Sequence, residues 1–196
     1  MTMMKPMSFL EMLDQSRDIM LNPSVATFER HEQRGTLANA ATYVGAAALI
    51  SALIGAISGG PIGFLSSLLA SLAQFFVFTG MVYLLGQKMF GGTGNWDEVA
   101  YTFSLFTAPL IVLGALVALV IVLFSWVPIL NLLVGLVGLV VSLLMLAVQI
   151  YYAYLAVQSG MNLRTGSQAA IVLVLAFLAT LLVSALLGSI VGAIFA

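Results

Sequence analysis

Cysteine is absent from the 196-residue chain, which excludes disulfides, zinc–thiolate sites and cysteine nucleophiles. Charge is also scarce: Lys, Arg, Asp and Glu make up 7% of the residues, whereas a soluble domain carries about 25%. The six Lys and Arg residues do not form the basic footprint of a nucleic-acid-binding protein. The composition therefore gives no reason to expect nucleic acid, a metal or an organic cofactor as a ligand.

Apolar residues take the place of the missing charges. They make up 62% of the chain, and the mean hydropathy is +1.17. A soluble protein of this composition would have no solvated surface, so a lipid bilayer is the expected solvent. Residues 1–9 do not lead into an apolar run, so no cleavable signal peptide is expected. The sequence predicts an integral membrane protein.

The few charged residues divide the chain into long apolar stretches. Nine of the thirteen lie within residues 1–34, and the remaining chain has charge-free stretches of 53, 65 and 32 residues. One span needs about 20 apolar residues, so the first two stretches hold two spans each. Turn signals at residues 58–61 and 125–128 mark the divisions. The sequence thus predicts an all-α bundle of five spans, at about residues 37–58, 62–86, 99–124, 129–157 and 168–195.

All six basic residues fall on one side of such a bundle. Four precede the first predicted span, Lys88 follows the second, and Arg164 follows the fourth. The positive-inside rule makes that side cytoplasmic. Most of the tyrosines lie near it and are expected to form an aromatic belt at the membrane interface. Residues 1–36 are therefore expected as a cytoplasmic segment, and the five-span domain at 37–196 is expected to end on the external side.

The segment before the first predicted span mixes apolar and charged residues. Residues 7–21 mix large apolar side chains, among them Phe9, Leu10, Leu13, Met20 and Leu21, with four charges, which favours an amphipathic helix lying on the inner leaflet. Asn22 and Pro23 break this helix, and Ser24 or Asn22 is expected to cap a second short helix that carries Phe28. A partly ordered tail is the alternative.

Two further groups of polar residues are candidates for chemistry. His31 is the only histidine, and its run of charged neighbours predicts a solvated side chain. Trp96, Asp97 and Glu98 follow a glycine-rich stretch and open the third predicted span. With Asn95 as the N-cap, Glu98 would complete a near relative of the capping box, and both acids would suit the positive end of the helix dipole. The alternative is a cytoplasmic contact site for a partner or a cation.

The predicted spans contain no Asp, Glu, Lys, Arg or His, which argues against a proton-driven pump or an intramembrane enzyme. Small and uncharged polar residues recur instead at helical spacing, and they predict either internal bundle packing or a polar groove for a lipid head group or small solute. These candidate intramembrane contacts, expected to face protein, are Ser67, Ser71 and Gln74 in the second span and Ser142 and Gln149 in the fourth. Pro109 is expected to kink the third span.

Three segments carry a resemblance to one known family. They are LNPSVATFERHEQRG at 21–35, GGTGNWDEVAYTFSLFTAPLIVLGAL at 91–116 and YAYLAVQSGMNLRTGSQAAIVLVLAF at 152–177. The first, with Pro23 and Phe28, resembles the segment before the first span in the Yip-one (Ypt/Rab-interacting protein) domain family of five-span membrane proteins. The second, with Phe106 and Pro109, resembles that family's glycine-rich entry to the third span. The third resembles its loop between the fourth and fifth spans.

In eukaryotes the resemblance implies binding to Rab-type small GTPases and a role in early secretory traffic. The Asp-Leu-Tyr-Gly-Pro signature of those members is absent, and residues 1–36 alone precede the first predicted span, so the chain resembles a short prokaryotic-type member of a plasma membrane. The resulting hypothesis is a non-enzymatic protein that organises lipids, a small GTPase, another membrane protein or further copies of itself. The rival hypothesis is a passive transporter, channel or lipid-moving protein that uses the polar faces of the second and fourth spans.

Overall fold

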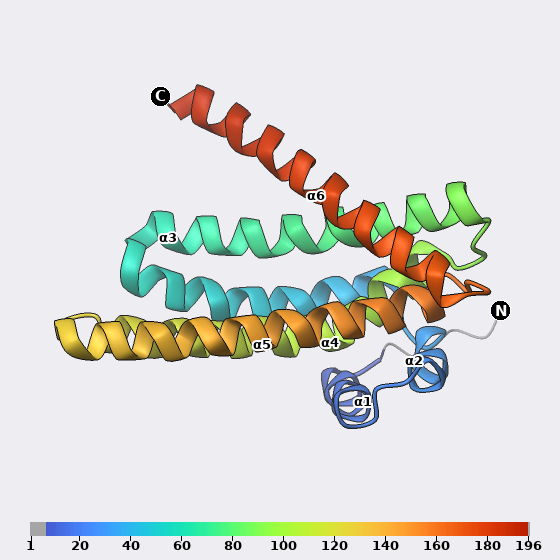
Figure 1. Ribbon diagram of the computed structural model, residues 1–196, viewed down its shortest axis with the longest axis horizontal. Helices are drawn as coiled ribbons and strands as arrows, with labels where there is room; N and C mark the ends of the chain where they lie inside the picture. The colour runs from blue at the N-terminus through green and yellow to red at the C-terminus, as the bar shows by residue number, and fades with distance from the viewer. Residues whose placement is uncertain (1–6, 196) are drawn as a thin grey trace.

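The computed structural model describes residues 7–195, with side chains over residues 7–186 (Figure 1). The regular structure in this range is entirely helical, as the sequence predicts. Two short helices precede four long ones. They are α1 (Phe9–Leu21), α2 (Val25–Glu32), α3 (Leu37–Phe90), α4 (Trp96–Phe124), α5 (Pro128–Gly160) and α6 (Gly166–Phe195).

Local sequence explains where these helices begin and end. Ser8 and Glu11 form a capping box at the start of α1, and the side chain of Ser24 caps α2 as predicted. Pro128 opens α5, where its missing N–H costs nothing because the first helical amides have no partner in the helix. Gly91 closes α3 with a left-handed φ of 65°, a conformation that glycine adopts without a steric penalty.

α3 is a hairpin of two helical halves joined at Gly60. Figure 1 shows it running to one end of the bundle and returning beside itself. Gly60 has φ 57° and ψ −148°, a conformation that strongly favours glycine. The halves approach closely, because a Cβ added to Gly55 would overlap the hydroxyl of Ser67 and lie 2.8 Å from the carbonyl oxygen of Gly63. The turn predicted at 58–61 is therefore present, with a single non-helical residue.

Four helices are long and apolar enough to cross a membrane: α3, α4, α5 and the described part of α6. The expectation of five separate spanning helices is thus met only in part. The first two predicted spans are the two halves of α3, because the turn at Gly60 is too tight to separate them into distinct helices. The other three predicted spans fall within α4, α5 and α6.

The two ends of the bundle carry different elements. Helices α1 and α2 and the loops 91–95 and 161–165 gather at one end, which we call the proximal end (Figure 1). The bend at Gly60 and the turn at 125–127 lie at the opposite, distal end. α4 packs on α3 and α5, whereas α6 packs on both of these helices and diverges from them along its length.

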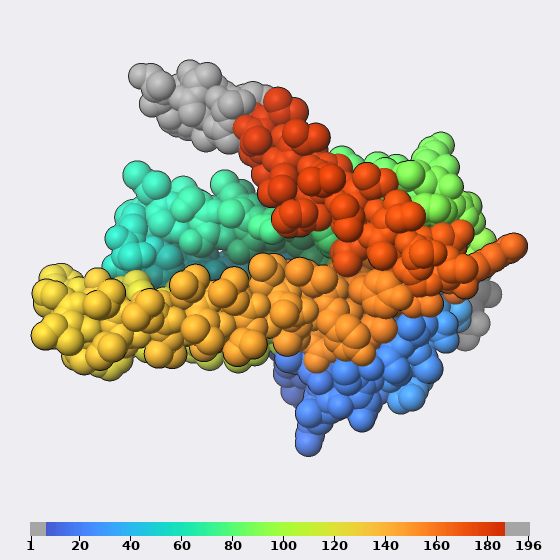
Figure 2. All heavy atoms as spheres, in the orientation of Figure 1, coloured from blue at the N-terminus to red at the C-terminus, as the bar shows by residue number. Residues whose placement is uncertain are grey.

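The buried core lies toward the proximal end. The buried residues of α4 run from Val99 to Leu110 almost without interruption, so this stretch is enclosed on all sides. Most of the large apolar side chains of α5 between Ile129 and Tyr151 are exposed instead. Figure 2 shows α1 and α2, in blue, covering the side of α5 near its C-terminal end while the rest of α5 is bare in this view. Such a bare apolar surface suits contact with lipid.

Candidate functional site

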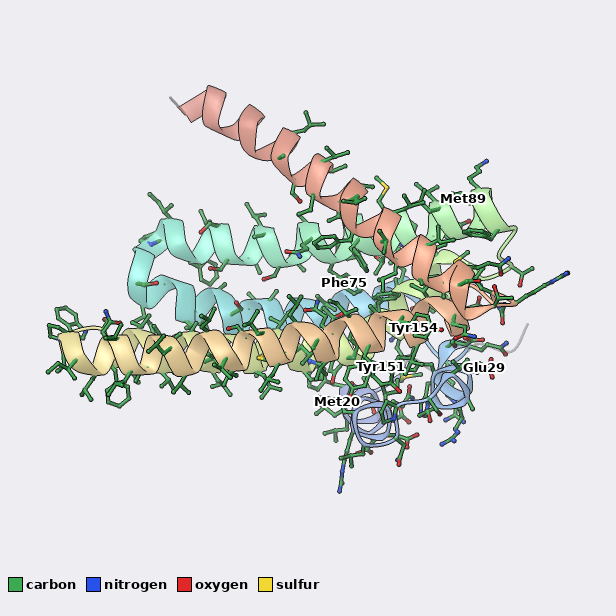
Figure 3. All side chains as sticks on the ribbon, in the orientation of Figure 1. Met20, Glu29, Phe75, Met89, Tyr151 and Tyr154 are labelled. Carbon is green, nitrogen blue, oxygen red and sulfur yellow. The ribbon has the colours of Figure 1, made fainter. Side chains whose placement is uncertain are left out.

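Three tyrosines from three long helices hold α1 at the proximal end. We call Tyr43 of α3, Tyr101 of α4 and Tyr152 of α5 the tyrosine seat. Each ring is buried, and each hydroxyl reaches a polar group of α1. The bonds join Ser16 Oγ to the Tyr43 hydroxyl (2.8 Å), the Tyr101 hydroxyl to Gln15 Oε1 (2.8 Å) and the Tyr152 hydroxyl to the Met20 carbonyl oxygen (3.0 Å). Figure 3 labels Met20 where α1 meets α5, with α1 lying crosswise to the long helices.

Apolar side chains complete the attachment of α1 and α2. Met12 and Ile19 of α1 and Phe28 of α2 are at most 1% exposed, and the Phe28 ring packs edge-on against Phe106 of α4. The helix predicted over residues 7–21 is confirmed as α1, but one of its faces packs on protein. Its other large apolar side chains remain exposed, namely Phe9, Leu10, Leu13 and Leu21.

Glu32 is a buried carboxyl at the junction of α2 and α5. The residue is 4% exposed and accepts a short hydrogen bond from the hydroxyl of Ser159, which is itself fully buried near the end of α5. Burial raises the pKa of Glu32 above its ordinary value, and the hydrogen bond from Ser159 opposes this, while the neighbouring carboxylates of Glu98 and Glu29 reinforce it. Glu32 therefore favours its neutral form more than a solvated glutamate does.

His31 is not the solvated residue that its charged neighbours predict. It is 6% exposed, and its Nε2 lies 2.9 Å from Oδ2 of Asp18 on α1. Arg30 reaches the same oxygen at 3.1 Å. The hydrogen bonds with His31 and Asn22 lower the pKa of Asp18. The burial has a tertiary cause, because the side of α2 that carries His31 packs toward α1. A histidine within a charged run is thereby buried.

Asp97 and Glu98 act as helix caps. The backbone N–H of Glu98 donates to Asn95 Oδ1 and that of Asn95 donates to Glu98 Oε2, each at 2.9 Å, which is the capping box that the spacing predicts. Asp97 Oδ1 accepts a 3.0 Å hydrogen bond from the backbone N–H of Leu37, the first residue of α3. Trp96, which precedes these two acids, is 40% exposed and presents an apolar surface beside them. Among the described residues, no group of three or more His, Asp or Glu side chains is placed to hold a metal ion.

The glycine-rich loop before α4 lies directly against the loop after α5. The backbone N–H of Thr93 donates to the carbonyl oxygen of Met161 at 3.2 Å. A Cβ added to Gly94 would overlap the carbonyl oxygen of Gly160, and Met161 is completely buried beside it. Glycine is needed here because the two backbones approach more closely than a side chain allows.

The predicted intramembrane polar residues do not gather into one site. Gln74, Gln149 and Ser142 are exposed in the single chain, and neither glutamine side chain has a hydrogen-bond partner among the described residues. Ser67 and Ser71 are half-buried. The two glutamines do not meet each other within the chain, because α3 and α5 each pack on α4 and α6 and not extensively on each other. The expectation that they face protein stays a prediction. Contacts of these residues with lipid or another copy of the chain stay a prediction.

Two further features involve α4. α4 passes through Pro109 as one continuous helix, so a kink at this residue stays a prediction. An open groove of about 380 Å³ lies between α4 and α5, and it is lined only by apolar side chains and one glycine, including Leu113, Val134, Gly138 and Met145. This lining offers no hydrogen bond to a polar solute.

Sequence reasoning did not find Glu32, Ser159 or the role of the tyrosine seat. Tyr101 and Tyr152 fitted an interfacial belt, Tyr43 was not singled out, and Glu32 is one acid in a charged run. A usable signal exists in α1, where Gln15 and Ser16 share the buried face with Met12 and Ile19. Buried polar side chains need hydrogen-bond partners, so this face predicts polar groups on whatever covers it.

Comparison with known proteins places these features in context. A family model described as the Yip1 domain matches residues 17–187, which is well over half of the chain and includes all six helices at least in part. The match confirms the resemblance found in the sequence. Together with the four long apolar helices, it establishes a protein integral to a membrane. No curated protein and no solved structure matches the chain.

Proposed function

This chain belongs to the Yip1 domain family, and on that premise we propose that it is a non-enzymatic membrane protein that organises partners or lipids at the cytoplasmic face. The observation that carries the proposal is the concentration of polar contacts at the proximal end, where α1, α2 and residues 87–98 form one platform. The described parts of the long helices carry no comparable polar site away from that end. We take this platform as the functional surface.

Five crossings are the topology that best suits the helices. α3 has 54 residues, or about 80 Å at 1.5 Å per residue, whereas the hydrocarbon core of a bilayer is about 30 Å thick. The bend at Gly60 divides it into two halves, each long enough for one crossing. With one crossing each for α4, α5 and α6, the proximal and distal ends lie on opposite sides of the membrane.

Basic residues support a cytoplasmic proximal end. The described Lys and Arg side chains are all exposed, and all belong to elements of that end: Arg17, Arg30, Arg34, Lys88 and Arg164. Cytoplasmic segments next to membrane spans carry an excess of such residues. We therefore propose a cytoplasmic N-terminus and an external C-terminus, in a plasma membrane of prokaryotic type.

α1 is proposed to rest on the inner leaflet beside the bundle. It lies crosswise to the long helices, so it is parallel to the membrane plane when they cross it (Figure 1). Its buried face is on protein, while Phe9, Leu10 and Leu13 remain exposed. An in-plane helix with an exposed apolar flank buries that flank at the boundary between head groups and acyl chains.

The partner is proposed to be a protein of the cytoplasmic face, either a small GTPase or another membrane protein, or a second copy of the chain. Trp96 is an exposed aromatic residue of the platform, and aromatic residues are enriched at protein interfaces. Passage of a solute is the less favoured function, because Gln74 and Gln149 do not meet and the groove between α4 and α5 is apolar.

Reporter fusions test the topology. Fusions after Gly60, after Val127 and at Ala196 are expected to report an external location, and fusions at Gly92 and Gly166 a cytoplasmic one. A cytoplasmic reporter at Ala196 would contradict the five crossings.

Site-specific photo-cross-linking tests the organising function. A photo-reactive residue at Trp96 or Leu10 is expected to capture a defined protein or lipid in native membranes, while the same residue at exposed Leu132 on the distal half of α5 captures bulk lipid alone. Purified protein in liposomes is expected to pass neither solutes nor lipids. Flux above that of empty liposomes, lowered by Gln74→Leu or Gln149→Leu, would replace the organising function with transport.

A further inference from the structure

Glu32 has an unusual position for an ionisable group. It is the last residue of α2, it is buried, and its hydrogen-bond donor is the neutral hydroxyl of Ser159. The charged groups that act on it are Glu98 of α4 and Glu29 of α2, which are both acidic. On α1, the carboxylate of Asp18 is bound by Arg30 and His31. No ion pair offsets a negative charge on Glu32 among the described residues.

Ionisation of Glu32 therefore works against the packing of α2 on the bundle. A buried carboxylate without a cationic partner is costly, whereas the neutral acid can keep its hydrogen bond to Ser159. Burial raises the pKa of Glu32 when α2 is docked, and exposure to solvent would return it toward its ordinary value. Docking is thus strongest at low pH, and it weakens as the pH rises above the ordinary value toward the raised one.

Movement of α2 would be transmitted to α1. The two helices are joined by three connecting residues and by the bonds of Asp18 to His31 and Arg30. Because the pKa of Asp18 is lowered, its carboxylate stays charged down to a low pH. Asp18 therefore links the two helices over the pH range in which Glu32 titrates. α1 and α2 consequently form one cap, held by the tyrosine seat, Phe28 and Glu32.

We propose that Glu32 and Ser159 form a proton-operated latch that holds this cap on the proximal end and releases it when Glu32 loses its proton. Release would expose the tyrosine seat and the buried face of α1 to a partner or to the inner leaflet. Only this exposure to a partner or to the inner leaflet rests on the proposed function. Docking itself can be measured without knowing the partner.

The absence of cysteine makes a direct measurement possible, because introduced cysteines would be the only ones. Spin labels at Ala26→Cys on α2 and Lys88→Cys at the end of α3 occupy two exposed positions. Pulsed electron resonance on the full chain in lipid nanodiscs, at pH values from about 4 to about 9, reports the distance between cap and bundle. A single narrow distance is expected at low pH, and a second, broader and longer population is expected to grow as the pH rises.

Three variants show which residue causes the pH-dependent change in distance. Glu32→Gln keeps the shape and the acceptor for Ser159 but cannot ionise, so the narrow distance is expected at every pH. Glu29→Gln removes an exposed acid one turn away and is expected to keep the response. Ser159→Ala removes the hydrogen bond that stabilises the ionised form of Glu32 in the docked cap. Ionisation then opposes docking more strongly, so release is expected to begin at a lower pH than in the parent chain.

Two results would overturn the latch. One is a distance that does not change with pH in the parent chain. The other is a pH response that survives in Glu32→Gln, which would assign the response to another group. Should Glu32→Gln fail to fold, an unchanged onset in Ser159→Ala would be equally decisive against the latch. None of these outcomes affects the topology or cross-linking results, so failure of the latch and of the proposed function are distinguishable.

Discussion

The proximal and distal ends of the same long helices are held together in different ways. Near the proximal end, α4 is enclosed between Val99 and Leu110, and hydrogen bonds with three tyrosines hold α1 across the bundle. Toward the distal end, α4 and α5 meet beside an open apolar groove, and α5 exposes most of its large side chains. The same two helices therefore change from protein core to membrane surface along their length.

The apolar character of a segment therefore does not determine how closely it packs against other helices in this chain. The distal half of α5 is strongly apolar, yet it is the least buried of the spanning segments. Lipid solvates apolar side chains as well as protein does, so helix contacts depend on close approach of small residues and on hydrogen bonds. The proximal end has both, in the glycine contacts of its loops and in its buried polar groups.

The sharpest test compares two glycines. Gly94→Ala would force its Cβ into the carbonyl oxygen of Gly160 and separate the two loops, so a loss of about 3 kcal/mol in the free energy of unfolding is expected. Gly135→Ala, on distal α5, meets nothing within 4 Å and is expected to gain about 0.5–1 kcal/mol through helix propensity. Unfolding by SDS titration in mixed micelles, followed by circular dichroism, measures both. Equal effects would erase the contrast between the ends.

A second test compares two tyrosines of the proximal end. Tyr101→Phe leaves Gln15 without its donor in a buried site, so the docking of α1 is expected to weaken by about 1–2 kcal/mol. Tyr151→Phe removes a hydroxyl from a half-exposed ring and is expected to change stability by less than about 0.5 kcal/mol. Hydrogen exchange of the α1 amides should rise in the first variant and stay constant in the second. Unchanged exchange in Tyr101→Phe would show that the bond between Tyr101 and Gln15 does not help to hold α1 on the bundle.

The smallest effects are expected from the two glutamines of the spans. Gln74 and Gln149 are exposed and lack hydrogen-bond partners among the described residues, so replacing either with Leu is expected to change stability by less than about 0.5 kcal/mol. Their effects should also be additive, because the two side chains do not meet. The double variant and both single variants are compared by SDS titration. A clearly sub-additive double variant would indicate that the two amides interact in the membrane.

Much of the fold was predictable because its signals are local. Long charge-free stretches indicate spanning helices, and the ends of α1, α2 and α4 follow from caps at Ser8, Ser24 and Asn95. The turn at Gly60 was located correctly, but its tightness depends on the close contact of the two halves of α3, so the five predicted spans became four long helices. Periodicity likewise placed Gln74 and Gln149 on polar faces without deciding which helices those faces would meet.

The candidate site was predictable only where a residue bonds to its own neighbourhood. The capping box of Asn95 and Glu98 spans three residues and was recognisable from spacing. The bonds between Leu37 and Asp97, His31 and Asp18, and Ser159 and Glu32 join separate helices. Nothing in a linear pattern distinguishes these partners from other polar residues at the same membrane boundary.

Hydropathy, charge placement and helix caps act over short distances, so they are enough to specify a membrane-embedded, all-α protein. The docking of α1 and α2 on the bundle, the burial of His31 and Glu32, and the exposure of the two glutamines depend instead on how the helices pack. Burial of a polar group depends on which surfaces meet, and meeting surfaces are set by the packing of whole helices. The most testable feature of the molecule, a buried acid held by a single hydroxyl, arises at such a meeting.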